Sequence, residues 1–487
     1  MLTQQELEKY LWGAATALRG TIDAGDYKQY IFPLLFFKRI SDVYDEEFAN
    51  ALAESDGDTE YATFAENHHF LIPEGAHWND VRETTVNIGQ ALQNAMRAIE
   101  QANPETLHGI FGDASWTNKE RLSDGMLTDL IEHYSQHKLN LSNVPDDKLG
   151  NAYEYLIKEF ADDSGHTAAE FYTNRTVVKL MTMIMDPQPG ESVYDPTCGS
   201  GGLLLNCALH LKDEGKEYRT LKLYGQEINL LTSAIARMNM FMHGIEEFDI
   251  VRGDTLANPG LLENDELKKF NVILANPPYS IKSWDRKTFE NDPYGRNLWG
   301  TPPQGCADYA FQQHIQKSLD LDNGRSISLW PHGILFRDAE ADMRRKMIEE
   351  DLVECVIGLG PNLFYNSPME ACLLITKTNK DKSRQGKVLI INAVKEVRQD
   401  KNIAYLENNH IERIYNAYTS YMNEDGFCKV VSIDDVLAHK ASLNMALYVS
   451  NVDSTGEKIS LNEALTNWSE CSDQLAISMN QLFKELG

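Results

Sequence analysis

Several features that mark membrane and secreted proteins are missing from this sequence of 487 residues. The longest aliphatic and aromatic run, IFPLLFF at 31–37, is far shorter than the roughly 18 residues that a membrane span needs. The first 20 residues carry acids early and no basic region before an apolar one, which argues against a signal peptide. We therefore expect no membrane partner.

Paired cysteines are also missing. The seven cysteines are scattered singly, without a C-x-x-C pair, so we expect neither a metal site nor a disulfide framework, and a cytoplasmic location. The G-x-x-x-x-G-K-[ST] phosphate-binding loop is absent as well, which argues against a nucleotide-driven motor.

Positive charge is scarce. The chain has 45 Lys and Arg against 73 Asp and Glu, a formal net charge of −28. Broad, unaided binding to nucleic acid needs clustered cations. If the protein acts on DNA or RNA, we expect a local basic patch or a basic partner. The hydrophobic content of 42% is ordinary for a globular protein with a sizeable core.

The spacing of apolar residues along the chain predicts three regions. Residues 1–150 place apolar residues at helical spacing and predict a helical N-terminal domain. Residues 151–400 alternate short apolar runs with helical stretches and predict a catalytic domain. Residues 401–487 are expected to be mostly helical, closing with a long or coiled-coil helix over 461–487.

The middle region predicts an α/β fold. Its strand candidates are 192–196, 221–227, 248–254, 271–276, 326–331, 354–360, 371–377 and 388–393, with helices at 230–244, 307–320 and 340–352. This alternation predicts a doubly wound, Rossmann-like parallel sheet. The last two strands lack room for a crossover helix between them, so we expect an antiparallel edge.

The segment YDPTCGSGG (194–202) is the first candidate binding site. A strand ends at Asp195, and an apolar helix follows the turn. The turn consists of Gly199, Ser200, Gly201 and Gly202. Such a turn lets a ligand approach backbone N–H groups at a helix N-terminus. The G-x-G-x-x-G order is absent, so a tight turn without a ligand is the alternative interpretation.

Two acids end the following strands. Glu227 lies where an acid that grips ribose hydroxyls is expected, about 20–30 residues beyond the glycine turn. Asp254 ends the third strand and is a candidate for contact with an adenine or amino group of the same ligand. A solvated strand end and ordinary turn chemistry are the alternatives for these acids.

The segment NVILANPPYS (271–280) is the second candidate site. Pro277 and Pro278 stop a buried strand, fix two φ angles and remove two N–H donors. The outward-facing groups are then the Asn276 amide, carbonyl oxygens and the Tyr279 ring. They suit a planar substrate with an amino group, whose hydrogens Asn276 and the Pro277 carbonyl accept while Tyr279 stacks. A strand-terminating turn is the alternative.

These motifs resemble those of a known family. DPTCGSGG followed by NPPY resembles the S-adenosylmethionine turn and catalytic motif of amino-group DNA methyltransferases, and AEFYTNR (169–175) resembles the family's GEFYTPR segment. This order is that of the γ class of N6-adenine enzymes. Residues 11–46 and 149–161 are similar to the helical region of type I restriction-modification methylation subunits. ADYAFQQHI (307–315) and LWPHGILFR (329–337) fit later motifs of that family.

The resemblance implies roles for individual residues. Asp195 and the glycine turn would hold S-adenosylmethionine, and Glu227 would bind its ribose hydroxyls. The covering segment would consist of Glu170, Phe171, Tyr172 and Thr173. Asn174 stands where the family usually has proline, which predicts a looser covering segment. The catalytic motif would be Asn276, Pro277, Pro278 and Tyr279, acting without a covalent enzyme intermediate.

The resemblance also implies the activity and the partners. The expected reaction is methyl transfer from S-adenosylmethionine to N6 of adenine in DNA, within a type I restriction-modification complex. A specificity subunit would read the target, a second methylation subunit and a motor-nuclease subunit would be further partners, and 401–487 would supply subunit contacts.

Alternative functions follow from the same motif. NPPY also occurs in enzymes that methylate protein glutamine or RNA amino groups, but these resemble the chain only in its central sheet. A solitary adenine DNA methyltransferase is a further alternative. The stretch 280–299 mixes Lys282, Arg286, Lys287 and Arg296 with two tryptophans, Trp284 and Trp299. It suits either a loop that meets the DNA backbone or an ordinary solvated loop.

Overall fold

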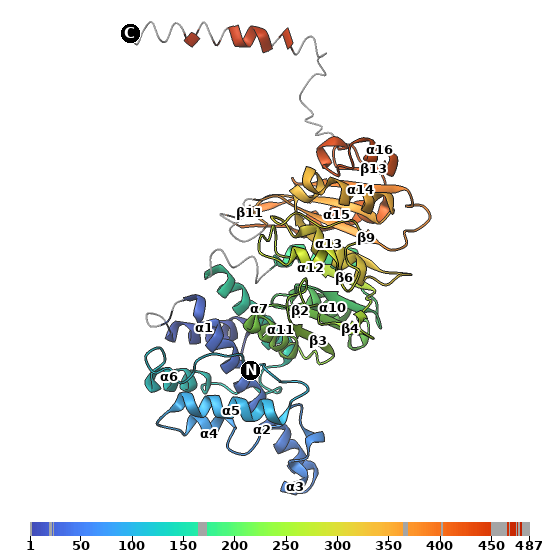
Figure 1. Ribbon diagram of the computed structural model, residues 1–487. Coiled ribbons are helices and arrows are strands. Elements are labelled where there is room, and N and C mark those ends of the chain that lie inside the picture. Colours follow the sequence, from blue (N-terminus) through green and yellow to red (C-terminus); the bar gives the residue numbers. More distant parts are fainter. Residues whose placement is uncertain are drawn as a thin grey trace.

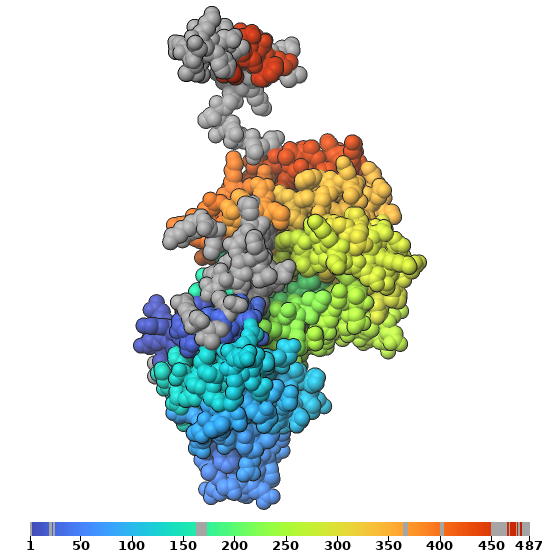
Figure 2. Space-filling model, turned by 60° about the vertical axis from the view of Figure 1, so that its left-hand side comes forward, coloured from blue at the N-terminus to red at the C-terminus, as the bar shows by residue number. Residues whose placement is uncertain are grey.

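The computed structural model describes residues 2–18, 22, 24–163, 173–363, 369–400 and 403–449, together with 465–466, 468–473, 475 and 478–479. Figure 1 shows a helical N-terminal layer, coloured blue to cyan, beside a sheet with helices on both faces. Figure 2 shows the same N-terminal part as a tapered lobe. In the described part of the chain, every helix is too short or too polar to cross a membrane.

The N-terminal layer is helical, as predicted. Its helices are α1 (Gln4–Ala17), α2 (Lys28–Glu54), α3 (Thr59–Ala62), α4 (Trp78–Arg82), α5 (Ile88–Ala102) and α6 (Asp124–Tyr134). Helix α2 lies at the centre and buries every residue from Tyr30 to Tyr44. One apolar core joins this layer to α7 (Asp146–Asp163) and to α11 (Leu230–Met242) of the sheet region. The layer therefore packs directly against the α/β part.

The α/β part is built on one sheet of nine strands. Their order is β13-β10-β8-β9-β7-β6-β1-β2-β3. The strands are β1 (Ser192–Asp195), β2 (Lys222–Glu227), β3 (Phe248–Arg252), β6 (Val272–Ala275), β7 (Arg325–Pro331), β8 (Val353–Leu359), β9 (Ala371–Lys377), β10 (Lys387–Ala393) and β13 (Cys428–Ser432). All eight strands predicted from the sequence are present, within two residues at each end.

The sheet is mostly parallel, and its antiparallel strands lie at other positions than the sequence predicted. Strand β9 runs antiparallel, but it lies inside the sheet between β7 and β8 rather than at an edge. Strand β10 pairs in parallel with β8 and not with β9. The antiparallel edge strand is β13, in a region that we expected to be helical. Two small hairpins, β4 (Leu262–Glu263) with β5 (Glu266–Leu267) and β11 (Arg398–Asp400) with β12 (Ile403–Tyr405), lie outside this sheet.

Helices cover both faces of the sheet, because successive strand residues face opposite sides. In β6, Val272 and Leu274 belong to one core, and Ile273 and Ala275 belong to the other. The first core is covered by α9 (Arg175–Met185), α10 (Gly202–Asp213) and α15 (Asn408–Ser420). The second is covered by α12 (Arg286–Glu290), α13 (Asp308–Ser318), α14 (Ala341–Glu349) and α16 (Ile433–Ala438). The doubly wound fold is therefore confirmed.

The end of the chain is described only in part. Residues 403–449 pack against the sheet through α15, α16 and β13. In the predicted terminal helix, residues 468–473 are helical and exposed. Much of that helix lies outside the described residues, so its extent stays a prediction.

Candidate active site

The predicted site lies where the strand order reverses. The chain runs from β1 to β2 and β3 on one side, then returns to β6 on the other side of β1. Strands β1 and β6 pair in parallel, with Val193 opposite Val272. The glycine turn after β1 and the NPPY motif after β6 therefore leave the same edge of neighbouring strands. Open α/β sheets bind their ligands in the crevice at such a switch point.

The glycine turn is held in a conformation that needs glycine. Gly199 has φ +54° and Gly201 has φ +79°, both in the left-handed region that disfavours a Cβ. A Cβ on Gly201 would lie 2.9 Å from Cε of Met240, and one on Gly202 would overlap the Arg175 guanidinium. Gly201 caps α10, and Gly202 is its first residue. The turn thus presents the start of a helix at this edge of the sheet, the geometry expected of a binding turn.

Two carboxylates flank this turn. Glu227 ends β2, where its Oε2 accepts the Gly199 N–H at 3.1 Å and its Oε1 accepts the Asn229 N–H at 2.8 Å. Asp195 is 1% exposed and accepts the Thr197 N–H at 3.0 Å. Burial, with a further contribution from the charge of Glu227, raises the pKa of Asp195 to about 8. The site therefore places two carboxyl groups beside a glycine turn.

The two carboxylates provide a test of fit for S-adenosylmethionine, which carries cationic groups. Among the described residues, no Lys, Arg or His forms a salt bridge with Asp195, which is almost fully buried. A buried carboxylate that lacks a cationic protein partner is costly unless a ligand compensates it. The buried acid, the second acid at the end of β2 and the glycine turn together fit this cofactor.

A partly buried network that the sequence did not reveal supports the turn on the side of the neighbouring helices. Glu154 of α7 accepts hydrogen bonds from Arg175 Nη2 at 2.5 Å and from Asn239 Nδ2 at 3.0 Å. Asn239 also donates to the Ser200 carbonyl at 3.1 Å, inside the glycine turn. Helices α7, α9 and α11 therefore meet at the turn. No local sequence pattern predicts this network, because its residues lie up to 85 positions apart.

The catalytic motif forms a side-chain cluster at the end of β6. The Tyr279 hydroxyl donates to Asn276 Oδ1 at 2.6 Å, and Asn276 Nδ2 donates to Thr173 Oγ1 at 3.0 Å. Burial raises the pKa of Tyr279, so its hydroxyl keeps the proton that it donates. Pro277 is buried, while the other residues of the motif are partly accessible. The Asn276 acceptor expected to meet the substrate is thus engaged by Tyr279 in this structure.

The covering segment is described only at its end. Glu170, Phe171 and Tyr172 lie outside the described residues, and Thr173 contacts Asn276 as given above. Asn174 caps α9, since its Oδ1 accepts the Thr176 N–H at 3.0 Å, and its Nδ2 donates to the Ala404 carbonyl at 2.9 Å. The Asn174 side chain thus forms a cap, and the expectation that it loosens the covering segment stays a prediction, because most of that segment lies outside the described residues.

Asp254 has a role in the local fold. Its Oδ1 accepts the N–H groups of Leu256 and Ala257 at 2.9 and 3.1 Å, which closes the turn after β3. This is the turn chemistry that we gave as the alternative. Contact with a ligand through its other oxygen stays a prediction.

The basic and aromatic stretch 280–299 is partly structural. Arg296 is buried, pairs with Asp292 at 2.6 Å and donates to the carbonyls of Thr255 and Leu256. Trp299 is buried too. Lys282 and Lys287 are exposed and Arg286 is partly exposed, so a contribution of this stretch to DNA contact stays a prediction that rests on these three residues.

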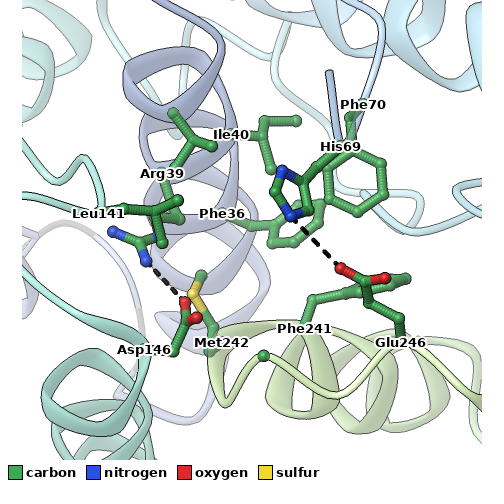
Figure 3. A pocket seen from close by; sticks show the side chains of 12 residues that line it. Phe36, Arg39, Ile40, His69, Phe70, Leu141, Asp146, Phe241, Met242 and Glu246 are labelled. Carbon is green, nitrogen blue, oxygen red and sulfur yellow. Dashed lines mark hydrogen bonds and ion pairs between the residues drawn. The ribbon is translucent and has the colours of Figure 1, made fainter. Parts of the chain in front are cut away.

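A separate cavity lies between the helical layer and the sheet region. It has a volume of about 70 Å³ and an aromatic floor formed by Phe36, Phe70 and Phe241 (Figure 3). Arg39 pairs with Asp146 at its rim at 2.7 Å. None of the predicted site residues lines this cavity. It is a cavity at the interface between two parts of the molecule and not the candidate active site.

The fold and the site define a class: the protein is an S-adenosylmethionine-dependent methyltransferase with an amino-group motif. Comparisons with known proteins then give the family. The model of the N-6 DNA methylase family matches residues 144–457, and that of the HsdM N-terminal domain matches residues 7–134.

Individual relatives agree with the family models. The chain is 32% identical to the type I restriction enzyme MjaVIII methylase subunit of Methanocaldococcus jannaschii, over 88% of this chain and 75% of that protein. It is 27% identical to the HindI methylase subunit of Haemophilus influenzae, over 81% of this chain and 94% of that one. The crystal structure of a type I restriction-modification methyltransferase subunit from Streptococcus thermophilus matches with a TM-score of 0.80 and 31% identity, covering 92% of this chain and all of that one.

The chain therefore belongs to the N-6 DNA methylase family, among the methylase subunits of type I restriction-modification systems. It is an adenine-specific DNA methyltransferase, and its methyl donor is S-adenosylmethionine. The match extends over the N-terminal helices as well as the sheet. This extent separates the chain from the protein-glutamine and RNA methyltransferases that share only the central motif.

Proposed function

We propose that Asn276 is the residue on which methyl transfer to adenine N6 depends. The observation that carries this proposal is the switch point between β1 and β6, which sets the NPPY motif beside the glycine turn. Asn276 Oδ1 and the Pro277 carbonyl accept the two N6 hydrogens and so orient the nitrogen lone pair. Bound S-adenosylmethionine supplies a methyl group on a positively charged sulfur. The protein contributes position and electrostatics.

Entry of the base changes the partner of Asn276. The target adenine has to leave the duplex stack, which costs a few kcal/mol. In the substrate-free chain, the Tyr279 hydroxyl occupies the Asn276 acceptor. The incoming amino group takes over this acceptor, and the Tyr279 ring then stacks on the base. Stacking of roughly 1–3 kcal/mol per base offsets much of the cost of extrusion.

Asp195, the glycine turn and Glu227 form the cofactor side of the proposed site. Asp195 faces a cationic part of the cofactor, and Glu227 binds its ribose hydroxyls. Support comes from the burial of Asp195 and from the hydrogen bond that ties Glu227 to Gly199. Thr173 Oγ1 accepts a hydrogen bond from Asn276 Nδ2 and so helps to orient the amide.

Substitution of Asn276 tests the proposal directly. Asn276→Ala removes the amide oxygen that accepts an N6 hydrogen in the transition state, and we expect kcat to fall by at least about 100-fold. Cofactor affinity, measured by calorimetry, should stay within about twofold of the wild type. The assay follows labelled methyl groups into plasmid DNA with a specificity subunit present, followed by nucleoside analysis.

A matched variant guards against a general effect of losing an asparagine. Asn94→Ala removes an exposed amide on α5, far along the chain from the motif, and should leave transfer unchanged. Full activity of Asn276→Ala would contradict the proposal. Label recovered in protein or in cytosine would contradict the adenine reaction itself.

We further propose the partners of the complex. With a net charge of −28, this chain needs a partner to read sequence, and its relatives are named as subunits of type I restriction enzymes. The proposed assembly joins two copies of this chain to one specificity subunit, and a motor-nuclease subunit adds to it. The measured mass of the co-purified complex should then include two chains of 55.2 kDa for each specificity subunit. A cytoplasmic location is proposed because the seven cysteines are free.

A further inference from the structure

Two family motifs remain without a role in the site described so far. ADYAFQQHI contains Asp308, the first residue of α13, and LWPHGILFR ends at Arg337, in the loop after β7. In the fold these residues form an ion pair, between Arg337 Nη2 and Asp308 Oδ2. The loop with Arg337 follows β7, which pairs in parallel with β6, so this loop and the NPPY motif leave the same edge of the sheet. Helix α13, with Asp308, precedes β7 in the chain. Their joint position suggests that they serve the same chemistry.

The pair is connected to the catalytic motif through one backbone group. Ser280 directly follows Tyr279, and its N–H donates to Asp308 Oδ1 at 2.7 Å. Asp308 is 0% exposed, so this hydrogen bond is shielded from water. One Asp308 oxygen accepts the hydrogen bond from Ser280 and the other pairs with Arg337, and the Cys306 thiol lies in the same cluster.

Ser280 also has an unusual backbone conformation. Its φ is +51°, in the left-handed region that is unfavourable for a residue with a Cβ. The turn after the two prolines thus depends on an outside interaction to keep this shape. The hydrogen bond to Asp308 is such an interaction. The direction of the Tyr279 side chain, and with it the contact to Asn276, follows from this turn.

Arg337 is itself fixed. Its Nε donates to Glu340 Oε2 at 2.8 Å, and Glu340 is 1% exposed. Its backbone N–H donates to the Gly333 carbonyl at 2.9 Å. A guanidinium held between two buried carboxylates cannot swing away without leaving charges unpaired. The ion pair therefore holds Asp308 against Ser280.

We propose that Asp308 and Arg337 are positioning residues for methyl transfer, which hold the left-handed turn at Ser280 and thereby aim Asn276 and Tyr279 at the target base. The proposal rests on the role given to Asn276 above. It assigns no contact between Asp308 or Arg337 and the base or the cofactor. It predicts a loss in kcat with little change in cofactor binding.

The main test is Asp308→Ala in the complex with a specificity subunit, acting on plasmid DNA. We expect kcat to fall by about 100-fold, the loss that misplacement of a reacting group produces. The Kd for S-adenosylmethionine should stay within about twofold. Arg337→Lys retains a charge but cannot bridge Asp308 and Glu340 in the same way, and should give about a tenfold loss.

A rescue experiment separates positioning from folding. Ser280→Gly keeps the N–H and adopts a positive φ without steric cost. In the Asp308→Ala background, Ser280→Gly should recover at least about tenfold in kcat, because the turn no longer needs the carboxylate to offset its strain. A purely structural role of Asp308 predicts no recovery.

The chain contains a matched control for Asp308. Asp124 is the first residue of α6, accepts the N–H groups of Asn87 and Ile88 at 3.2 Å, and pairs with Lys119 at 3.0 Å. Asn87 also has a positive φ, +57°. Asp124→Ala therefore removes the same kind of interaction far from the site, and should lower thermal stability without lowering kcat.

The outcomes distinguish this proposal from the proposed function. Equal kcat losses for Asp308→Ala and Asp124→Ala would overturn the positioning role, and so would a kcat loss without rescue by Ser280→Gly. Activity retained by Asn276→Ala would instead overturn the proposed function. If Asp308→Ala does not fold, Asp308→Asn replaces it, since this isosteric change weakens the pairing with Arg337 and should still lower kcat and not cofactor affinity.

Discussion

The proposed cofactor side and the proposed substrate side of the site differ in which chemical groups form them. The proposed cofactor side is mainly backbone: left-handed glycines and a helix start, with the carboxyl groups of Asp195 and Glu227 beside them. The substrate side consists of side chains that bind one another, from Thr173 through Asn276 to Tyr279. A cofactor has one shape and suits a rigid turn. A base that enters from DNA needs partners that can exchange hydrogen bonds.

The largest expected effect in this comparison comes from Glu227. Glu227→Ala removes the acceptor of the Gly199 N–H and the proposed ribose contact. Hydrogen bonds to a charged group contribute roughly 1.5–3 kcal/mol, so cofactor affinity should fall by about 100-fold. At saturating cofactor, kcat should remain near the wild type.

Calorimetry and steady-state kinetics check the Glu227 prediction. Glu263→Ala, an exposed acid on β4, serves as the control and should change neither value. A large loss in kcat at saturating cofactor would show that the two sides of the site are not separable.

The second expected effect concerns Tyr279. Tyr279→Ala removes stacking of roughly 1–3 kcal/mol, so kcat/KM for DNA should fall by about 30-fold. Tyr279→Phe keeps the ring and removes only the hydroxyl that occupies Asn276, so it should stay within about threefold. Transfer assays at varied DNA concentration measure both. Equal losses in the two variants would show that the hydroxyl, and not the ring, matters.

The third effect is a pH dependence of cofactor binding. Burial raises the pKa of Asp195 to about 8 in the free protein, whereas a cationic ligand favours the ionised form. Binding then releases a proton, so affinity should rise by about tenfold between pH 7 and pH 9 and level off above. Calorimetry in buffers of different ionisation enthalpy measures this proton. Asp195→Asn should remove the pH dependence that belongs to this group.

The same shift has a consequence for stability. Because the pKa of folded Asp195 lies above its unfolded value of roughly 3.9, the folded chain binds this proton more tightly. The corresponding stability is present at low pH and is lost as the pH rises toward about 8. Saturating cofactor should weaken this loss in thermal unfolding curves.

The smallest expected effect comes from Asn174→Pro, which restores the residue usual in the family. The φ of Asn174 is −53°, so proline fits the backbone and only the side-chain hydrogen bonds are lost. We expect a loss of about 1 kcal/mol in unfolding free energy, measured with denaturant. Cofactor affinity should change by less than about twofold. A change in cofactor affinity above tenfold would show that the Asn174 cap contributes to cofactor binding.

The sequence predicted those parts of the fold that local patterns encode. The strands of the nine-stranded sheet other than β13 were found because each is a short apolar run between turn signals. Strand β13 was missed, since CKVVS is a short edge strand within a helical texture. The insertion of β9 between β7 and β8 was also missed, because strand order depends on contacts across the sheet and not on the strand's own residues.

The site shows the same division. Asn276, Asp195 and the glycine turn were predicted because motif and strand end coincide. The Tyr279 contact to Asn276 was not, since both residues were expected to face the substrate. Asp308 and Arg337 were visible as parts of motifs, but their meeting with Ser280 joins segments 28 and 29 residues apart. Spacing alone does not predict such a contact.

Helix α7 has a practical consequence for dividing this protein. Glu154 anchors Arg175 and Asn239, and through Asn239 it holds the Ser200 carbonyl. A catalytic fragment excised after α7 would therefore lose the support of its own glycine turn. A cut at residue 150, where the texture of the sequence changes, passes through the helix. A graft of the methyltransferase onto another recognition system has to carry α7 whole.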